Sequence, residues 1–264
     1  MAIDRRLERS EAVARYGLIG RSLGHSFSQR YFTEKFAREG RTAARYDLFE
    51  LAEVSELPDL IRNTPGLRGL NVTIPYKQTV VPLLSELDPV AAAVGAVNTI
   101  AIHADGRTTG HNTDVEGFRV TLQPLLERLA KRDTDIRPRA LVLGNGGASR
   151  AVAYVLREAG IRFRIVSRDR TMGDLTWEQL DRTVVGVCPL IINATPLGTF
   201  PDVDDAPPLP YNAIGPDHLL IDLVYNPEET LFLKRGKVQG ATTANGLTML
   251  HAQAEAAWRI WEAE

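Results

Sequence analysis

The sequence lacks the features that would indicate a metal protein, a membrane protein or a nucleic-acid-binding protein. Its five histidines show no metal-ligand spacing, and no apolar run approaches the roughly 18 residues that a membrane-spanning helix needs. Its 31 basic and 33 acidic residues leave a net charge of −2, so no overall field attracts nucleic acid or an anionic membrane surface. We therefore expect a small molecule as partner, with no metal, nucleic acid or membrane.

Cysteine is also scarce. Cys188 is the only one, which excludes a disulfide within the chain and is typical of a reducing compartment, so we predict a cytoplasmic protein. Its setting in the apolar run V-V-G-V-C indicates a buried strand and an inert thiol. Residues 1–11 mix both charges and lack the apolar core of a secretory signal, which predicts a flexible extension. A monomer and a homodimer both agree with this composition.

What the sequence does contain is an alternation of short apolar runs with amphipathic stretches, which is typical of parallel sheets covered by helices. In the first half this pattern predicts strands at 16–19, 45–50, 69–73 and 99–103, and helices at 28–39, 52–63, 77–84 and 89–94. In the second half it predicts strands at 139–143, 162–167, 190–194 and 219–224, and helices at 115–131, 150–159 and 247–261. The fold class is therefore α/β.

Three polar motifs interrupt the first series: N-V-T-I-P-Y-K at 71–77, A-V-N-T at 96–99 and H-N-T-D at 111–114. They set one lysine, Lys77, and one carboxylate, Asp114, among hydrogen-bonding side chains. A lysine that meets a buried carboxylate can hold or move a proton beside a carbonyl group. Each piece also has a structural interpretation: Lys77 as a surface lysine, Asn98 as a turn residue, and Asp114 as the N-cap of the following helix.

A glycine-rich loop opens the second series. An apolar strand runs directly into G-N-G-G-A-S at 144–149, and a helix follows it. Backbone N–H groups and the helix dipole can meet a pyrophosphate at such a loop, although Ser149 occupies the third position of the G-x-G-x-x-G fingerprint. The predicted cofactor contacts here are Gly144, Asn145, Gly146, Gly147 and Ala148. A tight turn without a ligand is the alternative.

The residues about 20 positions further on distinguish the two nicotinamide cofactors. A carboxylate at the end of the second strand binds the ribose 2′-hydroxyl of NAD, whereas an arginine accommodates the phosphate of NADP. Ser167 stands at the carboxylate position here, and Arg168 and Arg170 follow it. This arrangement favours NADP, while Asp169 between the arginines keeps NAD possible. A solvated turn is the structural alternative.

These motifs together resemble the shikimate dehydrogenase family, which carries N-V-T-x-P-x-K, A-V-N-T and N-T-D in this order, followed by a G-x-G-G-A loop. The resemblance implies an N-terminal α/β substrate domain, a Rossmann-type dinucleotide-binding domain and a cleft between them. By this resemblance residues 12–112 with 247–264 form the substrate-binding and catalytic domain. Residues 113–246 form the NADP-binding domain.

The resemblance also implies roles for single residues. The substrate would meet Ser26, Ser28, Asn71, Thr73, Asn98, Tyr225 and Gln253, the two serines by holding its carboxylate. The cofactor would meet Asn193, Thr195, Leu223 and Gly246 on the nicotinamide side, with Arg168 on the 2′-phosphate and Ser167 and Arg170 beside it. Taken alone, the segment that contains Ser26 and Ser28 (the serine segment) could form a helix N-cap, for which Ser28 is well placed.

The function implied is NADP-dependent, reversible reduction of 3-dehydroshikimate to shikimate, a step of chorismate and aromatic amino-acid biosynthesis. Lys77 and Asp114 would form the catalytic pair, and nicotinamide C4 would deliver the hydride. Two alternatives stay open. One is a quinate/shikimate dehydrogenase that uses NAD, and the other is a non-catalytic dinucleotide-binding regulatory module.

Overall fold

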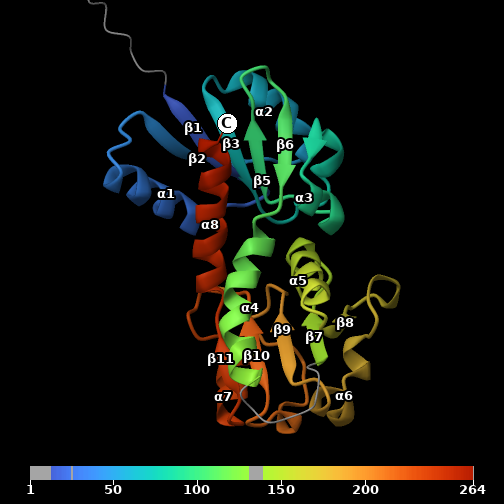
Figure 1. Ribbon diagram of the computed structural model, residues 1–264. Coiled ribbons are helices and arrows are strands. Elements are labelled where there is room, and N and C mark those ends of the chain that lie inside the picture. The colour runs from blue at the N-terminus through green and yellow to red at the C-terminus, as the bar shows by residue number, and fades with distance from the viewer. Residues whose placement is uncertain (1–12, 25, 131–138, 264) are drawn as a thin grey trace, which may run out of the picture.

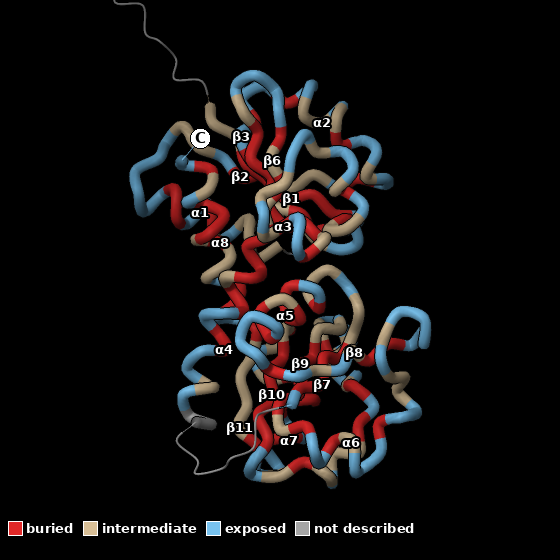
Figure 2. Tube along the Cα trace, turned by 45° about the vertical axis from the view of Figure 1, so that its right-hand side comes forward, coloured by how far each residue is buried: buried red, intermediate tan, exposed pale blue. Residues whose placement is uncertain are grey.

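The computed structural model describes residues 13–24, 26–130 and 139–263. These residues form two separate sheets, one above the other in Figure 1, with helices around each. Buried residues concentrate along the strands of both sheets and in the helices that pack on them (Figure 2). The extension predicted at residues 1–11 and the histidine at position 25 lie outside the described residues.

The first sheet is mixed. It contains β1 (Ala14–Gly20), β2 (Ala44–Glu50), β3 (Leu67–Val72), β4 (Glu86–Leu87), β5 (Thr99–Ile102) and β6 (Thr108–His111), in the order β2-β1-β3-β5-β6-β4. Strands β1, β2 and β3 are parallel, but β5 is antiparallel to both β3 and β6. The prediction of parallel strands is therefore wrong for this part, because a short hairpin through Gly106 joins β5 to β6 and leaves no room for a crossover helix.

Helices around the first sheet follow the predictions except in one place. They are α1 (Phe27–Arg38), η1 (Val54–Glu56), α2 (Leu57–Asn63), η2 (Val81–Leu83) and α3 (Pro89–Val94). The helix predicted at 77–84 is wrong: turns run to Val80 and only the short η2 follows. Pro82 explains this, because it has no N–H to continue a helix. The N-cap of α1 is Ser26, not Ser28.

The second sheet is wholly parallel, as predicted. It contains β7 (Arg139–Leu143), β8 (Arg162–Val166), β9 (Leu190–Asn193), β10 (Leu219–Asp222) and β11 (Thr242–Ala244), in the order β11-β10-β9-β7-β8. Around it lie α5 (Gly147–Glu158), η3 (Arg170–Met172), η4 (Trp177–Gln179), α6 (Arg182–Gly186), η5 (Tyr211–Ala213) and α7 (Leu231–Val238). The α/β fold class is confirmed.

The strand predicted before Cys188 is wrong. Residues 182–186 form the helix α6, because the Asp181 side chain accepts a hydrogen bond from Val184 N at 2.8 Å and so caps the helix. The thiol is buried all the same, and burial raises the pKa of Cys188. An inert core thiol remains the interpretation.

Two long helices lead from one sheet to the other. They are α4 (Asp114–Ala130) and α8 (Leu247–Glu262), which pack against each other (Figure 1). Residues at the end of α8 belong to the core of the first sheet: the Trp261 indole donates to Ile100 O at 3.0 Å and stacks on Tyr16 at 5.1 Å. Gly69 makes room for this ring, since a Cβ there would stand 2.2 Å from Trp261 Nε1. The α8 helix thus returns to the first sheet.

The strand order of the second sheet also locates a binding position. Strand β7 lies between β8 and β9, so the connections from β7 and β9 leave the sheet in opposite directions. Ligands of such folds bind outside the carboxyl ends of the strands at this point. The glycine loop follows β7, and Thr195 follows β9. A Cβ at Gly144 would stand 3.0 Å from Thr195 Cγ2, so these two loops are in contact.

Candidate active site

The Lys77 and Asp114 side chains form a close ion pair. Lys77 Nζ donates to Asp114 Oδ2 at 2.6 Å, and the two side chains are 17% and 2% exposed. Asp114 begins α4, while Lys77 follows β3 through a turn whose Tyr76 is buried. A buried carboxylate stays favourable only when it is paired and hydrogen-bonded. The surface interpretation of Lys77 is therefore wrong.

Asn98 connects this pair to the rest of the site. Its Nδ2 lies 3.0 Å from each of Asp114 Oδ1, Thr113 Oγ1 and Gln253 Oε1, and its Oδ1 accepts from Thr113 N at 2.7 Å. Gln253 comes from α8, so Asn98 links a strand start, α4 and α8. With only 3% of its surface exposed, Asn98 is a buried polar centre and not a simple turn residue.

A second group of polar side chains continues from Asn98 toward α1. Asn71 Nδ2 donates to Asn98 O at 3.4 Å and to Thr99 Oγ1 at 3.2 Å, and Asn71 Oδ1 accepts from the Tyr46 hydroxyl at 2.7 Å. Ser28 hydrogen-bonds the same hydroxyl, and burial raises the pKa of Tyr46. Tyr46 is absent from the sequence predictions, because a tyrosine inside a strand indicates a core position.

The remaining substrate candidates lie around this group without a shared side-chain network. Ser26 Oγ accepts from Gln29 N at 3.4 Å as the cap of α1. Tyr225, from the loop after β10, has its ring 5.8 Å from that of Phe27, the residue between the two serines. The structure thus brings Tyr225 to the serine segment through an aromatic contact. Thr73 contributes backbone bonds, donating to Ile19 O at 3.0 Å.

The glycine loop has the geometry of an anion-binding turn. Gly144 has φ +107°, a conformation that favours glycine. Gly146 is the N-cap of α5 without a side-chain hydrogen bond, and a Cβ on it would meet nothing within 4 Å. The first N–H groups of a helix lack acceptors within the helix. Open space before uncapped N–H groups fits a pyrophosphate, with Asn145 and Ala148 beside it.

The carboxyl ends of β9 and β10 form a buried network beside that loop. Asn193 accepts from Thr195 Oγ1 at 2.6 Å and donates to Asp222 Oδ1 at 2.9 Å. Asp222 also accepts from Thr230 Oγ1 at 2.5 Å, and desolvation raises the pKa of its carboxyl group to about 6 despite these bonds. The sequence reasoning missed Asp222 and Thr230. The only available signal was a carboxylate closing an apolar strand.

This network leads to the other predicted nicotinamide contacts. Leu223 N donates to Asn193 O at 2.9 Å. A Cβ on Gly246 would stand 2.2 Å from Leu223 O, so glycine is required there by close approach of two backbones. Leu223 is therefore held between Asn193 and Gly246, and the contact of these residues with the nicotinamide stays a prediction.

The segment after β8 resolves the role of its acidic residue. Asp169 caps η3, because its Oδ1 accepts from Thr171 N at 2.8 Å and Thr171 Oγ1 at 2.7 Å, and these bonds lower its pKa. Ser167 is buried and accepts from Asp169 N at 3.2 Å. Arg168 and Arg170 are exposed. The carboxylate is thus held by its own turn, and the two guanidinium groups are available to an anion.

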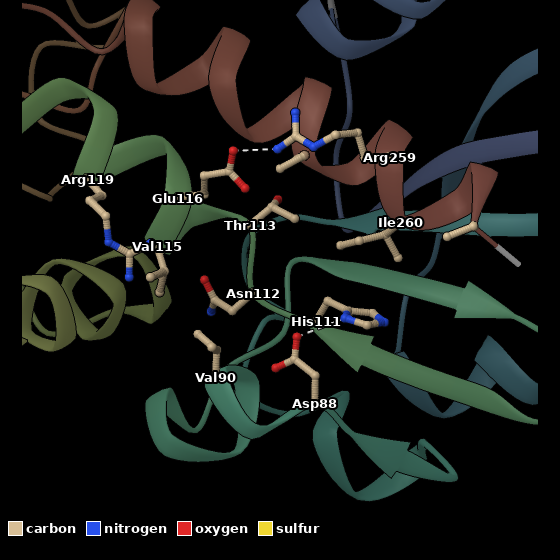
Figure 3. A pocket seen from close by; sticks show the side chains of 12 residues that line it. Asp88, Val90, His111, Asn112, Thr113, Val115, Glu116, Arg119, Arg259 and Ile260 are labelled. Carbon is tan, nitrogen blue, oxygen red and sulfur yellow. Dashed lines mark hydrogen bonds and ion pairs between the residues drawn. The ribbon is translucent and has the colours of Figure 1, made fainter.

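A cavity of about 370 Å³ lies behind the H-N-T-D segment, between β6, α4 and the end of α8 (Figure 3). Its ionisable residues are all paired: His111 Nδ1 lies 2.8 Å from Asp88 Oδ2, Glu116 bonds Arg259, and Arg119 bonds Glu158 outside the lining. Neither Lys77 nor Asp114 lines it. His111, the neighbour of the Asn-Thr-Asp motif, is therefore engaged with Asp88 in a cavity that neither member of the ion pair lines.

The sequence predicts neither a metal site nor a membrane-spanning helix. Within residues 13–24, 26–130 and 139–263 no group of three or more His, Cys, Asp or Glu side chains is arranged to hold a metal ion. In the same ranges no helix is both long enough and apolar enough to cross a bilayer.

Comparison with known proteins decides the family. A family model described as the shikimate dehydrogenase substrate binding domain matches residues 18–100. A shikimate dehydrogenase (NADP(+)) from Clostridium beijerinckii is 39% identical, over 94% of this chain and 91% of the relative. The chain belongs to the shikimate dehydrogenase family. The predicted family is therefore confirmed.

Solved structures of shikimate dehydrogenase relatives agree in fold but differ in cofactor. The shikimate 5-dehydrogenase of Thermus thermophilus, in complex with NADP(H) and shikimate, is 30% identical with a TM-score of 0.77, covering 95% of this chain and 94% of its own. A quinate dehydrogenase from Corynebacterium glutamicum, in complex with NAD, is 30% identical with a TM-score of 0.80 over the same shares of both chains. The turn after β8, which carries Arg168 and Arg170, therefore bears on the choice between NADP and NAD in this chain.

Proposed function

We propose that this chain is an NADP-dependent shikimate dehydrogenase that reversibly reduces 3-dehydroshikimate to shikimate, with Lys77 and Asp114 as its catalytic pair. Family membership supports the reaction class. The observation that carries the proposal is the 2.6 Å ion pair of Lys77 and Asp114, enclosed by hydrogen-bonding side chains next to the glycine loop. The step belongs to chorismate and aromatic amino-acid biosynthesis.

The chemistry divides between cofactor and protein. NADPH, when bound, supplies the hydride that reaches the ketone carbon. Negative charge then develops on the ketone oxygen, where the Lys77 ammonium stabilises it and donates the proton that completes the hydroxyl group. Asp114 holds that ammonium, and Asn98 holds Asp114 through its second oxygen. Fixed donors of this kind need no rearrangement during the reaction.

The substrate side follows from the polar side chains around the pair. A ring with three hydroxyls needs several short donors and acceptors, which Asn71, Thr73, Asn98 and Gln253 supply in this proposal. Ser26, Ser28 and Tyr225 hold the carboxylate at the other end. The contact of Phe27 with Tyr225 supports this grouping, because it joins the serine segment to the loop after β10.

The residues that hold NADP are those of the second sheet. Gly146 and Gly147 offer N–H groups of α5 to the pyrophosphate, and Arg168 and Arg170 bind the 2′-phosphate. The cap formed by Asp169 supports NADP, because a carboxylate engaged by Thr171 is held in its own turn. A quinate/shikimate dehydrogenase that uses NAD is the second candidate, favoured by the likeness to the NAD-bound quinate dehydrogenase.

The domain limits belong to the same proposal. Residues 12–112 with 247–264 form the substrate-binding and catalytic domain, and residues 113–246 form the cofactor domain, with the substrate in a cleft between them. Position 12 and position 264 lie outside the described residues. The packing of Trp261 under β5 supports the return of the chain to the first domain. We propose a cytoplasmic monomer or homodimer.

One experiment distinguishes these functions. The purified protein is assayed with shikimate and with quinate, each with NADP and with NAD, by the absorbance of the reduced nicotinamide. Turnover of shikimate with NADP at the highest kcat/KM is the expected result. A preference for quinate and NAD would move the assignment to the second candidate, and absence of all four activities in a folded protein would leave only the regulatory module.

A further inference from the structure

Gly147 lies where the cofactor loop meets the lysine of the ion pair. It is the first residue of α5, and a Cβ built on it would stand 2.9 Å from Lys77 Cβ and 3.1 Å from Lys77 Cδ. Real Cβ atoms essentially never approach other heavy atoms below 3.0 Å. A side chain at position 147 therefore has to displace either Lys77 or the start of α5.

The three glycines of this loop are required for different reasons. Gly144 has a positive φ of +107°, so its backbone conformation favours glycine. Gly146 would accept a Cβ with nothing within 4 Å. Gly147 is not among the residues with positive φ, so its backbone would tolerate alanine and only the contact with Lys77 opposes it. The contact is thus separable from backbone strain by mutation.

Lys77 cannot move away from this contact at low cost. Its carbonyl oxygen accepts from Val97 N at 2.7 Å, and its ammonium donates to Asp114 Oδ2 at 2.6 Å. The atom closest to Gly147 is Cβ, which is fixed by the backbone and does not move with the rotamer. Pressure from position 147 therefore shifts the backbone of Lys77, and with it the ammonium, or else pushes α5 away.

We propose that Gly147 is a positioning residue for Lys77, in addition to any contact with the cofactor. Because Gly147 has no side chain, the loop that would hold the pyrophosphate can contact the aliphatic part of the Lys77 side chain. The ammonium group of that side chain would donate the proton. One contact then fixes the distance between the two reacting partners. This inference rests on the proposed catalytic role of Lys77.

The first test is Gly147→Ala, measured as kcat, KM for each ligand and dissociation constant for NADP. A displacement of about 1 Å at a reacting group can cost about 100-fold, so we expect kcat to fall about 10- to 100-fold while NADP affinity changes less. Gly186→Ala is the matched control, because that exposed glycine ends α6 and a Cβ there meets nothing within 4 Å. Its kcat should equal that of the wild type.

Gly146→Ala provides the contrast within the loop. Its Cβ would enter the open space assigned to the pyrophosphate, so we expect the KM for NADP to rise more than kcat falls. If Gly147→Ala behaved in the same way, with its kcat retained at saturating cofactor, Gly147 would serve the cofactor alone and the inference would be overturned.

A double-mutant cycle separates this inference from the proposed function. Lys77→Gln keeps the Cβ, Cγ and Cδ atoms but removes the ammonium, so adding Gly147→Ala should lower kcat less than twofold further. Losses that multiply would overturn the positioning role. Lys77→Gln alone tests the proposed function: an undiminished kcat in that single variant would remove the catalytic role of Lys77, whatever the cycle gave.

A measurement without turnover complements the cycle. In the cofactor-free protein, labelling of the Lys77 amine by an amine-specific reagent is followed by mass spectrometry, and the thermal unfolding midpoint confirms that each variant is folded. Gly147→Ala should label faster than wild type, because the ammonium is drawn away from Asp114. An unchanged rate in a folded variant would contradict the proposal.

Discussion

The two halves of the candidate site differ in whether side chains or backbone form them. Around the first sheet, the site consists of side chains that hydrogen-bond one another, with Asn98 joined to Asp114 and Gln253 across long sequence separations. Around the second sheet, it consists largely of backbone that approaches closely, at Gly144 and at Gly246. In the proposed function, the first half recognises the hydroxyls of the substrate and the second half holds the cofactor.

This difference determines how each half responds to mutation. Removing one member of a side-chain network leaves its partners buried and unsatisfied, which costs about 1–3 kcal/mol for each group. A backbone site has no such partners, so only a change of space or charge affects it. We therefore expect losses of chemistry from the first half and losses of cofactor binding from the second.

The largest effect should come from Lys77→Gln. Because the ammonium acts mainly in the transition state, kcat should fall by about 10² to 10⁴-fold with substrate binding comparatively unchanged. Asp114→Asn should also lower kcat, and the double variant should be little worse than the poorer single one. Steady-state kinetics provide the check, with Lys237→Gln on the exposed surface as control.

A Lys77→Gln variant that kept most of its kcat, with normal folding and cofactor binding, would reduce Lys77 to a binding residue. His111 would then be the next sequence candidate for the acid. Its engagement with Asp88, in a cavity that neither Lys77 nor Asp114 lines, argues against that role.

The pH dependence of stability should have opposite signs in the two halves. Burial raises the pKa of Asp222 from 3.8 to about 6, so the folded state binds this proton more tightly than the unfolded state. The contribution of Asp222 to stability therefore falls as pH rises from about 4 to 6, by up to about 3 kcal/mol. Near the first sheet, the bond from His111 lowers the pKa of Asp88, although desolvation opposes it. Its contribution is present above pH 3.8 and is lost as pH falls through the lower, folded value.

Denaturant unfolding at pH 4 and pH 7 measures this contrast. Relative to Asp222→Asn, the wild type should be more stable at pH 4 than at pH 7. Relative to Asp88→Asn, the wild type should gain stability as pH rises from about 3 to about 5, which a second pair of unfolding experiments at these pH values measures. The same sign for both pairs would show that the two carboxyl groups do not differ as proposed.

Cofactor choice should depend on Arg168. A charge-assisted contact to a phosphate contributes about 1.5–3 kcal/mol, so Arg168→Ala should weaken NADP by roughly 10- to 150-fold and NAD only slightly. Titration calorimetry with both cofactors gives the comparison. Arg164→Ala is the control, since Arg164 lies on β8 but forms a surface pair with Asp174. Equal losses for NADP and NAD would refute the phosphate contact.

The smallest effect should come from Ser26→Ala. One lost hydrogen bond of about 1 kcal/mol should raise the KM for shikimate roughly fivefold and lower kcat less. Because Ser26 also caps α1, the variant should lose about 1 kcal/mol of stability. Ser26→Asn retains a capping oxygen and should recover the stability. A normal KM with a collapsed kcat would contradict a role in binding.

Most of the second sheet could be predicted from the sequence, because buried parallel strands are continuous apolar runs that end in recognisable loops. Strand β7 has its predicted limits, and β8, β9 and β10 begin where expected. Strand β11 was missed, since Thr242–Ala244 is short and polar. In the first sheet, β4 and β6 were missed for the same reason.

Site residues that belong to sequence motifs could be predicted. Residues that join the site only through tertiary contacts could not. The pairing of Lys77 with Asp114 followed from their chemistry. Tyr46 has no local signal that separates it from a core residue, and the only signal for Asp222 is that a carboxylate ends an apolar strand. The contact of Gly147 with Lys77 joins residues from both halves, so only the three-dimensional arrangement could reveal it.

The position of Trp258 and Trp261 in α8 has a consequence for folding during translation. Both rings fill the core of the first sheet, yet they are translated only after every strand of the second sheet. At about 5–20 residues per second, the first sheet waits on the order of ten seconds for its final layer. The N-terminal half therefore leaves the ribosome first but completes its core only when α8 has been made.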